Sequence, residues 1–290
     1  MKEKMLVLLN RIIIAIVISV ISFPVFSEEI NTDYLKIKWS FKGIFGTFDR
    51  ASLQRGYQVY QEVCSGCHSV QHLSYRNLSE KGGPEFSIEE AKAIAAQFEV
   101  EDGPNSDGEM FMRPGRLSDK FVKPYPNVEA AAAANGGAYP PDMSVLAKAR
   151  AGGADYIYSL LLGYEEAPAG FELDDGVYYN KYMPGNKIKM SAPISDGLVD
   201  YSDGTQATTA QMSKDVTAFL VWAAEPHLES QHRMGFKAII YLIILLTLVY
   251  FSKQKVWSRF GSKKEPEEET FDKVEKAVTE YEGEDPKTFK

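Results

Sequence analysis

Two cysteines and a histidine lie within five residues of one another, as Cys64, Cys67 and His68. The spacing C-x-x-C-H is the attachment signature of a c-type haem. Two thiols three positions apart can form thioether bonds with the two vinyl groups on one edge of a porphyrin. The histidine that follows then binds the iron as the proximal ligand. Since these are the only two cysteines of the chain, the motif predicts one covalently bound haem c.

A C-x-x-C pair also occurs in thioredoxin-like redox proteins, in zinc sites and by chance. The redox motif belongs to a βαβ setting, and no strand pattern flanks Cys64 and Cys67. A zinc site needs a second pair of ligands at a suitable spacing, which the sequence lacks. The export signal described below adds to the preference for haem.

A haem with His68 on one face also needs a ligand on the other. His72 is too close to His68 to reach that face, and the other two histidines, His227 and His232, lie beside the predicted membrane segment. A methionine thioether is the alternative, and it raises the reduction potential relative to a second imidazole. The candidates in irregular regions are Met110, Met112, Met183 and Met190. Residue chemistry alone does not choose between Met183 and Met190.

Two apolar runs near the ends of the chain indicate its compartment. The first spans Ile12 to Phe23, follows a basic segment, and precedes the residues Val25-Phe26-Ser27. This pattern is typical of a secretory signal, and we expect residues 1–27 to be cleaved. An uncleaved anchor is the alternative, although the apolar core is short for a membrane span.

The second run, Ala238–Phe251, lies between Lys237 and Lys253 and has no polar face. Such a run suits lipid better than a protein core, so we expect residues 236–252 to span the membrane. Basic residues follow it, and the positive-inside rule then places residues 253–290 in the cytoplasm and residues 28–235 outside. We therefore expect a bacterial inner (cytoplasmic) membrane protein with a periplasmic haem domain and a charged, disordered cytoplasmic tail.

The predicted external domain, residues 28–235, contains 19 Lys and Arg against 29 Asp and Glu, a net charge of −10. This charge argues against nucleic acid and against anionic lipid as partners, and it favours a basic soluble partner.

Helical spacing and capping signals predict a mainly α-helical domain with long irregular loops. The expected helices cover residues 50–63, 88–97, 129–134, 142–150, 154–162 and 209–224. Ser87 and Glu90 form a capping box for the second of these helices, and Asp142 is the expected cap of the fourth. Residues 99–127 and 163–208 have turn signals and little periodicity.

Longer stretches of the sequence, over roughly residues 35–260, resemble the cytochrome c1 family, the haem subunits of the ubiquinol–cytochrome c reductase (cytochrome bc1) complex. The matching stretches are Val63–Ser69, Arg113–Gly115, Leu117–Asp119, Lys123–Asn127, Asn135–Ser144, Tyr178–Asn180, Pro184–Gly185, Ile188–Pro193, Asp203–Thr205, Ala207–Thr208, Trp222–Pro226 and Arg233–Gly235. Together they are far more specific than the haem motif alone.

The resemblance implies a cytochrome c-like haem domain with one C-terminal transmembrane helix. It maps the distal haem ligand to Met190, and it implies that Arg113 and Tyr125 lie at the haem propionate edge. It also implies that Gly56 and Tyr60 mark the crossing of the first helix with the last, opposite Trp222 or Phe219. The sequence departs from the family pattern at Lys189, where an apolar residue is common.

The resemblance further implies a non-catalytic electron-transfer subunit. It would pass one electron from the Rieske iron–sulfur protein to a cytochrome c, in a membrane complex with cytochrome b. Two other classes stay open on the residues alone. A stand-alone membrane-anchored c-type cytochrome would need the same haem but not the family's loops, and a haem enzyme would need an open distal site.

Overall fold

The computed structural model describes residues 33–258 and 273–278. These residues separate into two compact units, one formed by residues 33–42 and 47–226, and the other by residues 43–46 and 227 onward. The predicted signal peptide, residues 1–27, and most of the predicted tail, residues 259–272 and 279–290, lie outside the described residues. Cleavage after Ser27 and disorder of the tail therefore stay predictions.

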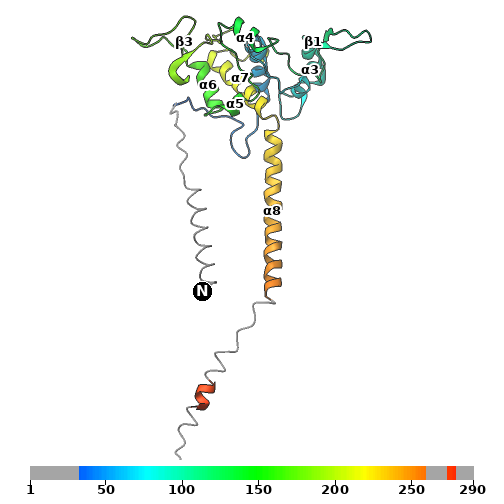
Figure 1. Ribbon diagram of the computed structural model, residues 1–290, viewed down its shortest axis with the longest axis vertical. Coiled ribbons are helices and arrows are strands. Elements are labelled where there is room, and N and C mark those ends of the chain that lie inside the picture. The colour runs from blue at the N-terminus through cyan, green and yellow to red at the C-terminus, as the bar shows by residue number, and fades with distance from the viewer. Residues whose placement is uncertain (1–32, 259–272, 279–290) are drawn as a thin grey trace, which may run out of the picture. The chain divides into compact units, whose positions relative to one another are not determined.

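The first unit is mainly helical, as the sequence predicts (Figure 1). Its α-helices are α2 (Arg50–Val59), α3 (Ile88–Ala95), α4 (Val128–Ala134), α5 (Leu146–Ala149), α6 (Ala154–Leu162) and α7 (Thr209–Ala224). Long connections join them and contain two short 3-10 helices, η2 (Tyr75–Ser79) and η3 (Pro184–Asn186). The capping box predicted for α3 is present, with Ser87 and Glu90 hydrogen-bonded reciprocally.

Helix α2 leads directly into the haem motif. The Asp49 side chain caps its first turn by accepting hydrogen bonds from the amides of Ala51 and Ser52. After Val59 the chain widens into a π-helix, η1 (Tyr60–Cys64), and the Ser65 amide donates to the Tyr60 carbonyl over 2.8 Å. Single π-turns inside a helix are often found at functional sites, and this one ends at the first cysteine.

Helix α2 crosses α7 at Gly56, as the resemblance implies. A Cβ atom on Gly56 would lie 2.1 Å from the carbonyl oxygen of Asp215 and 2.8 Å from Cβ of Phe219. One turn further along, the ring of Tyr60 stacks on Phe219 with centroids 5.5 Å apart. Phe219, rather than Trp222, is therefore the residue opposite Tyr60.

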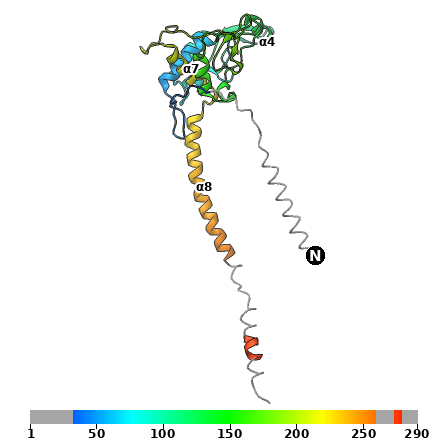
Figure 2. The ribbon, with the colours of Figure 1, turned by 90° about the vertical axis from the view of Figure 1, so that its left-hand side faces the viewer.

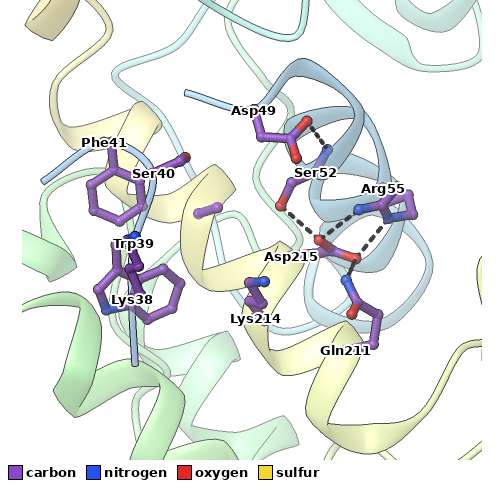
Figure 3. Close-up of a pocket in the computed structure, with 11 residues that line it drawn as sticks. Lys38, Trp39, Ser40, Phe41, Asp49, Ser52, Arg55, Gln211, Lys214 and Asp215 are labelled. Atoms are coloured by element: carbon purple, nitrogen blue, oxygen red, sulfur yellow. Dashed lines mark hydrogen bonds and ion pairs between the residues drawn. The ribbon is translucent and has the colours of Figure 1, made fainter. Parts of the chain in front are cut away.

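A buried carboxylate joins the two helices beside this crossing. Asp215 of α7 is fully buried and accepts hydrogen bonds from Ser52 Oγ (2.6 Å), Arg55 Nε (2.8 Å) and Gln211 Nε2 (2.9 Å). Figure 3 shows these three side chains converging on Asp215 at the wall of a small pocket. Because its oxygens are satisfied in this way, the buried charge does not stand alone.

The structure differs from the prediction in three places between residues 99 and 208. Residues 99–127 contain a β-hairpin, in which β1 (Glu99–Asp102) pairs antiparallel with β2 (Phe111–Pro114). The expected helix over 142–150 shrinks to the single turn of α5, because Asp142 bonds to a distant segment instead of capping it. Between residues 163 and 208, β3 (Tyr178–Tyr179) pairs with β4 (Lys187–Ile188).

The second unit contains α8 (Leu228–Trp257), a 30-residue helix that is unbroken in both views (Figures 1 and 2). Among the described residues it is the one helix long and apolar enough to cross a membrane. At 1.5 Å per residue it is roughly 45 Å long, more than the roughly 30 Å of a hydrocarbon core. It therefore extends beyond the predicted span of residues 236–252 at both ends, into polar sequence.

Candidate haem site

The C-x-x-C-H motif forms one tight helical turn at the end of η1. The amide of Cys67 donates to the Cys64 carbonyl over 3.1 Å, and the amide of His68 donates to the same carbonyl over 2.9 Å. Residues three and four apart in such a turn share a face. The two thiols and the imidazole therefore leave the backbone on one side, which the attachment of a single porphyrin edge requires.

A backbone carbonyl determines which ring nitrogen of His68 is available to bind a metal. Nδ1 of His68 lies 2.9 Å from the carbonyl oxygen of Pro141. Since a carbonyl only accepts, Nδ1 carries the hydrogen and Nε2 keeps its lone pair. Burial lowers the pKa of His68, although the Pro141 hydrogen bond and Asp142 oppose this effect. The result is a neutral imidazole with an unprotonated Nε2, the form that binds a metal.

The segment that supplies this carbonyl is tied to the haem motif by Asp142. Its carboxylate accepts hydrogen bonds from Ser69 Oγ (2.7 Å), the Gln71 amide (3.0 Å) and the Ser144 amide (2.8 Å). The Met143 amide also donates to the Ser69 carbonyl over 2.8 Å. Residues 141–144 therefore act as a strap across residues 68–72, which we call the His68 strap.

The two cysteines are not bonded to each other, and Cys64 lies in an environment that favours the neutral thiol. Burial raises the pKa of Cys64 to about 12, and the neighbouring Cys67 adds to the rise. Redox-active C-x-x-C pairs have the opposite property, a thiol pKa lowered by positive charge or a helix N-terminus. This environment differs from that of a thioredoxin-like motif.

Met183 and Met190, the two candidates for the second haem ligand, differ in their contacts. The sulfur of Met183 lies 3.9 Å from the hydroxyl of Tyr156, within reach of a weak hydrogen bond. Met190 is held by its backbone instead, since Tyr164 donates its hydroxyl to the Met190 carbonyl over 3.1 Å. That bond fixes the position of the residue, and no hydrogen bond to its sulfur is formed by the residues that the structure describes.

Arg113 is already paired with two carboxylates. It donates to Asp102 through Nε, and to Asp119 through Nη1 (2.6 Å) and Nη2 (3.0 Å). Nη1 also donates to the Pro114 carbonyl over 3.1 Å. These contacts raise the pKa of Arg113, with Asp119 the larger cause, so the group stays charged. Within the described part of the chain, one Nη2 hydrogen remains for a further acceptor.

Tyr125 lies on a different loop and is half-buried. Its hydroxyl accepts a hydrogen bond from Asn135 Nδ2 over 3.2 Å and keeps its own hydrogen for donation. The turn that follows Asn135 also contacts the segment that carries Met190, since Lys189 Nζ donates to the Gly136 carbonyl over 3.1 Å. The loop that carries Tyr125 is thus linked to the residue before Met190.

The donor set suits a haem better than a metal held by protein ligands alone. No group of three or more His, Cys, Asp or Glu side chains converges anywhere in residues 33–258 or 273–278. Two unpaired thiols, a neutral imidazole and a thioether are instead the groups that bind a c-type haem.

Comparisons with known proteins identify the family of the chain. The model of the cytochrome c1 family matches residues 39–260. The chain belongs to the cytochrome c1 family. A mitochondrial cytochrome c1, heme protein, from Solanum tuberosum is 50% identical over 226 residues, which cover 78% of this chain and 86% of that protein. A mitochondrial cytochrome c1, heme protein, from Saccharomyces cerevisiae is 48% identical and covers 78% of this chain and 72% of its own.

A cytochrome b/c1 of Bradyrhizobium diazoefficiens is also similar, at 50% identity over 240 residues. The match covers 76% of this chain but only 35% of that protein. Membership of the cytochrome c1 family supports haem as the cofactor and electron transfer as the role.

The residues that sequence analysis missed are those of the His68 strap. Pro141, Asp142 and Ser144 act on His68 from more than 70 positions away. One local signal was available, because Asp142 followed two residues later by Ser144 is typical of an Asx turn. The structure contains that turn. The sequence gives no sign that its other oxygen binds Ser69.

Proposed function

We propose that this cytochrome c1 family member is the electron-transfer subunit of a ubiquinol–cytochrome c reductase complex. It carries one haem c, bound covalently through Cys64 and Cys67, with His68 and Met190 as axial ligands. It takes one electron from the Rieske iron–sulfur protein and passes it to a cytochrome c, on the periplasmic side of a bacterial inner membrane.

The observation that carries this proposal is the tautomer and orientation of the His68 imidazole. An imidazole whose Nδ1 donates to a backbone carbonyl presents Nε2 as a ligand, and the two unpaired cysteines lie on the same turn. The family match over residues 39–260 supports the wider assignment to the complex. The uncommitted Met190 thioether supports its role on the distal side.

When bound, the haem supplies an iron that cycles between its ferric and ferrous states. The chain does the rest by ligation, burial and positioning. The His68 strap keeps the imidazole oriented and strengthens it as a donor. Tyr164 holds the backbone of Met190 in place. Arg113 and Tyr125 would each offer one hydrogen to a haem propionate.

The proposal is tested on the full-length chain in its own membranes. We expect the protein to co-purify with a multi-span cytochrome b and an iron–sulfur protein, with antimycin-sensitive electron transfer from quinol to cytochrome c. The denatured chain should retain its haem, and replacing both cysteines with serine should abolish that retention. The reduced spectrum should not change with carbon monoxide, because both axial positions are filled.

Two results would contradict the proposal in different ways. Isolation of the protein alone, with quinol oxidation intact in a strain that lacks it, would favour a stand-alone membrane-anchored carrier. A spectrum that shifts with carbon monoxide would indicate an open distal position and a haem enzyme.

A further inference from the structure

The turn Gly43–Gly46 carries two large apolar side chains at its tip. The Gly46 amide donates to the Gly43 carbonyl over 3.0 Å, which closes a four-residue turn with Ile44 and Phe45 at its centre. Exposed turn centres are usually occupied by Gly, Pro, Asn, Asp or Ser. Ile44 and Phe45 are instead 76% and 77% exposed, the highest values among the large hydrophobic side chains that the structure describes.

The same turn is grouped with the membrane-spanning helix. Residues 43–46 fall in the second unit together with α8. The ring of Phe45 meets the ring of Phe236 edge to face, with centroids 6.5 Å apart. Phe236 lies directly before Lys237 and the apolar run Ala238–Phe251. Phe236 is the first residue of the proposed span, residues 236–252, so Phe45 contacts α8 at the end of that span.

Two exposed basic side chains, Lys36 and Lys38, precede the turn in the sequence. Residues 33–50 contain four basic side chains, of which Lys42 and Arg50 pair with Asp155 and Glu85, whereas Lys36 and Lys38 are exposed and make no ion pair with the described residues. Basic groups beside inserted aromatic and aliphatic side chains are typical of contact with the headgroup region.

We propose that the Gly43–Gly46 turn inserts Ile44 and Phe45 into the outer interface of the bilayer, as a second membrane contact besides α8. The occupant of this apolar tip is phospholipid, and the acyl boundary next to Phe236 receives both side chains. The proposal rests on α8 crossing the membrane as in the proposed function. It goes beyond that function by assigning a lipid-binding role to a loop of the external domain.

The test is a depth measurement on the haem-loaded, full-length chain in vesicles of phosphatidylethanolamine and phosphatidylglycerol. Since haem attachment uses both native cysteines, a single introduced cysteine gives one site for a spin label. The labelled variants are Phe45→Cys, Ile44→Cys, Phe236→Cys, Leu246→Cys and Ser106→Cys. Collisions with oxygen report lipid exposure, and collisions with a water-soluble nickel complex report aqueous exposure.

We expect labels at 44 and 45 to resemble the label at 236, with high oxygen access and low nickel access. The label at 246 should lie deeper, and the label at the exposed polar Ser106 should be fully aqueous. Nickel access at 45 equal to that at 106 would overturn the proposal. Low access to both reagents would also overturn it, because a protein partner would then cover the turn. An aqueous label at 246 would contradict the membrane span itself, which keeps the two failures distinct.

A second pair of variants tests the apolar character of the tip without relying on a label there. A label at Thr47→Cys is combined either with Ile44→Ser and Phe45→Ser or with Ile44→Leu and Phe45→Leu. We expect nickel access at 47 to rise toward that at 106 in the serine pair and to stay low in the leucine pair. Equal access in both pairs would count against insertion of the tip.

Discussion

The carbonyl oxygen of Pro141 lies 2.9 Å from Nδ1 of His68, although 73 residues separate them in the sequence. This contact leaves Nε2 as the only nitrogen of His68 able to bind iron. It also draws electron density toward the ring and strengthens the imidazole as a donor. The proposed ligand is therefore oriented by a distant segment as well as by the C-x-x-C-H motif.

The Asp142→Ala variant tests this dependence. Losing the three hydrogen bonds to Asp142 should loosen the His68 strap and weaken the Pro141 contact. A less basic imidazole stabilises the ferric state less, so the midpoint potential should rise. The net value of one hydrogen bond, ~0.5–1.5 kcal/mol, corresponds to about 20–60 mV for one electron. Redox titration of the haem protein measures the change.

Asp196→Ala is the matched control, since Asp196 also accepts hydrogen bonds from its own chain, here the amide and hydroxyl of Thr209. It should alter stability without moving the potential. Equal shifts in both variants, or none in Asp142→Ala, would show that the strap does not act on His68.

The distal ligand is tested by Met190→Leu against Met183→Leu. Both changes remove a sulfur at nearly constant volume, for which we expect a stability loss below about 1.5 kcal/mol. Met190→Leu should lose the low-spin spectrum and change the midpoint potential, whereas Met183→Leu should lose only its contact with Tyr156. An unchanged spectrum and potential in Met190→Leu would exclude that residue, and the reverse pattern would assign Met183.

The crossing of α2 and α7 predicts that Gly56→Ala damages the whole domain. The added Cβ would meet backbone atoms of Asp215 at 2.1 Å, and backbone cannot move aside as a flexible side chain can. We expect a loss of about 1–3 kcal/mol or more in the free energy of unfolding, measured with denaturant on the haem protein. Gly235→Ala is the control, because nothing lies within 4 Å of its Cβ position. Similar losses in both variants would mean that the close approach at Gly56 is not the cause.

Asp203 gives a pH-dependent prediction. The Thr205 amide, followed by the Arg55 guanidinium, lowers the pKa of Asp203 to about 2. An unfolded aspartate titrates near about 3.9, so the folded state favours the charged form. The charged Asp203 stabilises the folded state fully above the unfolded pKa of about 3.9. This stabilisation is lost as the pH falls toward the folded pKa of about 2. Asp203→Asn should thus be less stable than the parent at neutral pH.

The difference in unfolding free energy between parent and Asp203→Asn should shrink as the pH falls from about 4 toward 2. The exposed neighbour Asp200 supplies the control, and Asp200→Asn should differ little from the parent across the same range. A constant difference for Asp203→Asn at every pH would refute the pairing with Arg55 and Thr205.

Local signals in the sequence predicted the local structure well. The Ser87–Glu90 capping box gave the start of α3, and apolar spacing gave α6 and α7. The family resemblance located the helix crossing at Gly56, which depends on one small residue. The capping box and the apolar spacing depend on residues within a few positions of each other, and the crossing was predicted from the family resemblance.

Hydrogen bonds between side chains of distant segments were not predicted. Asp142 looked like a helix cap because its neighbours fit one, but Ser69 and the Gln71 amide compete for the same carboxylate. The Asp215 network links residues about 160 positions apart, from Ser52 and Arg55 on α2 to α7. Neither set of hydrogen bonds produces a periodic pattern in the sequence. Analysis of local sequence patterns could therefore not predict them.

The acidic loops predict how a cytochrome c would dock. One acidic cluster consists of four exposed side chains, Glu165, Glu166, Asp174 and Asp175. Among the described residues, only Asp174 of these four forms an ion pair, with Lys187 at 3.5 Å. We expect the four charges to steer a basic partner, since exposed charges act over roughly 10 Å at moderate salt. Neutralising all four to Gln or Asn should slow cytochrome c reduction at low salt and leave the haem spectrum unchanged.

The β1–β2 hairpin supplies a matched comparison with the same number of charges. Glu99, Glu101, Asp107 and Glu109 are also exposed, while Asp102 is already paired with Arg113. Steering changes the association rate and its slope against salt, and it has little effect once transfer within the complex is limiting. Stopped-flow reduction at several salt concentrations therefore tells which quadruple variant reduces the slope. A parent protein whose rate does not depend on salt would exclude electrostatic steering by either cluster, because a partner held by apolar contact or by a tether gains nothing from long-range charge.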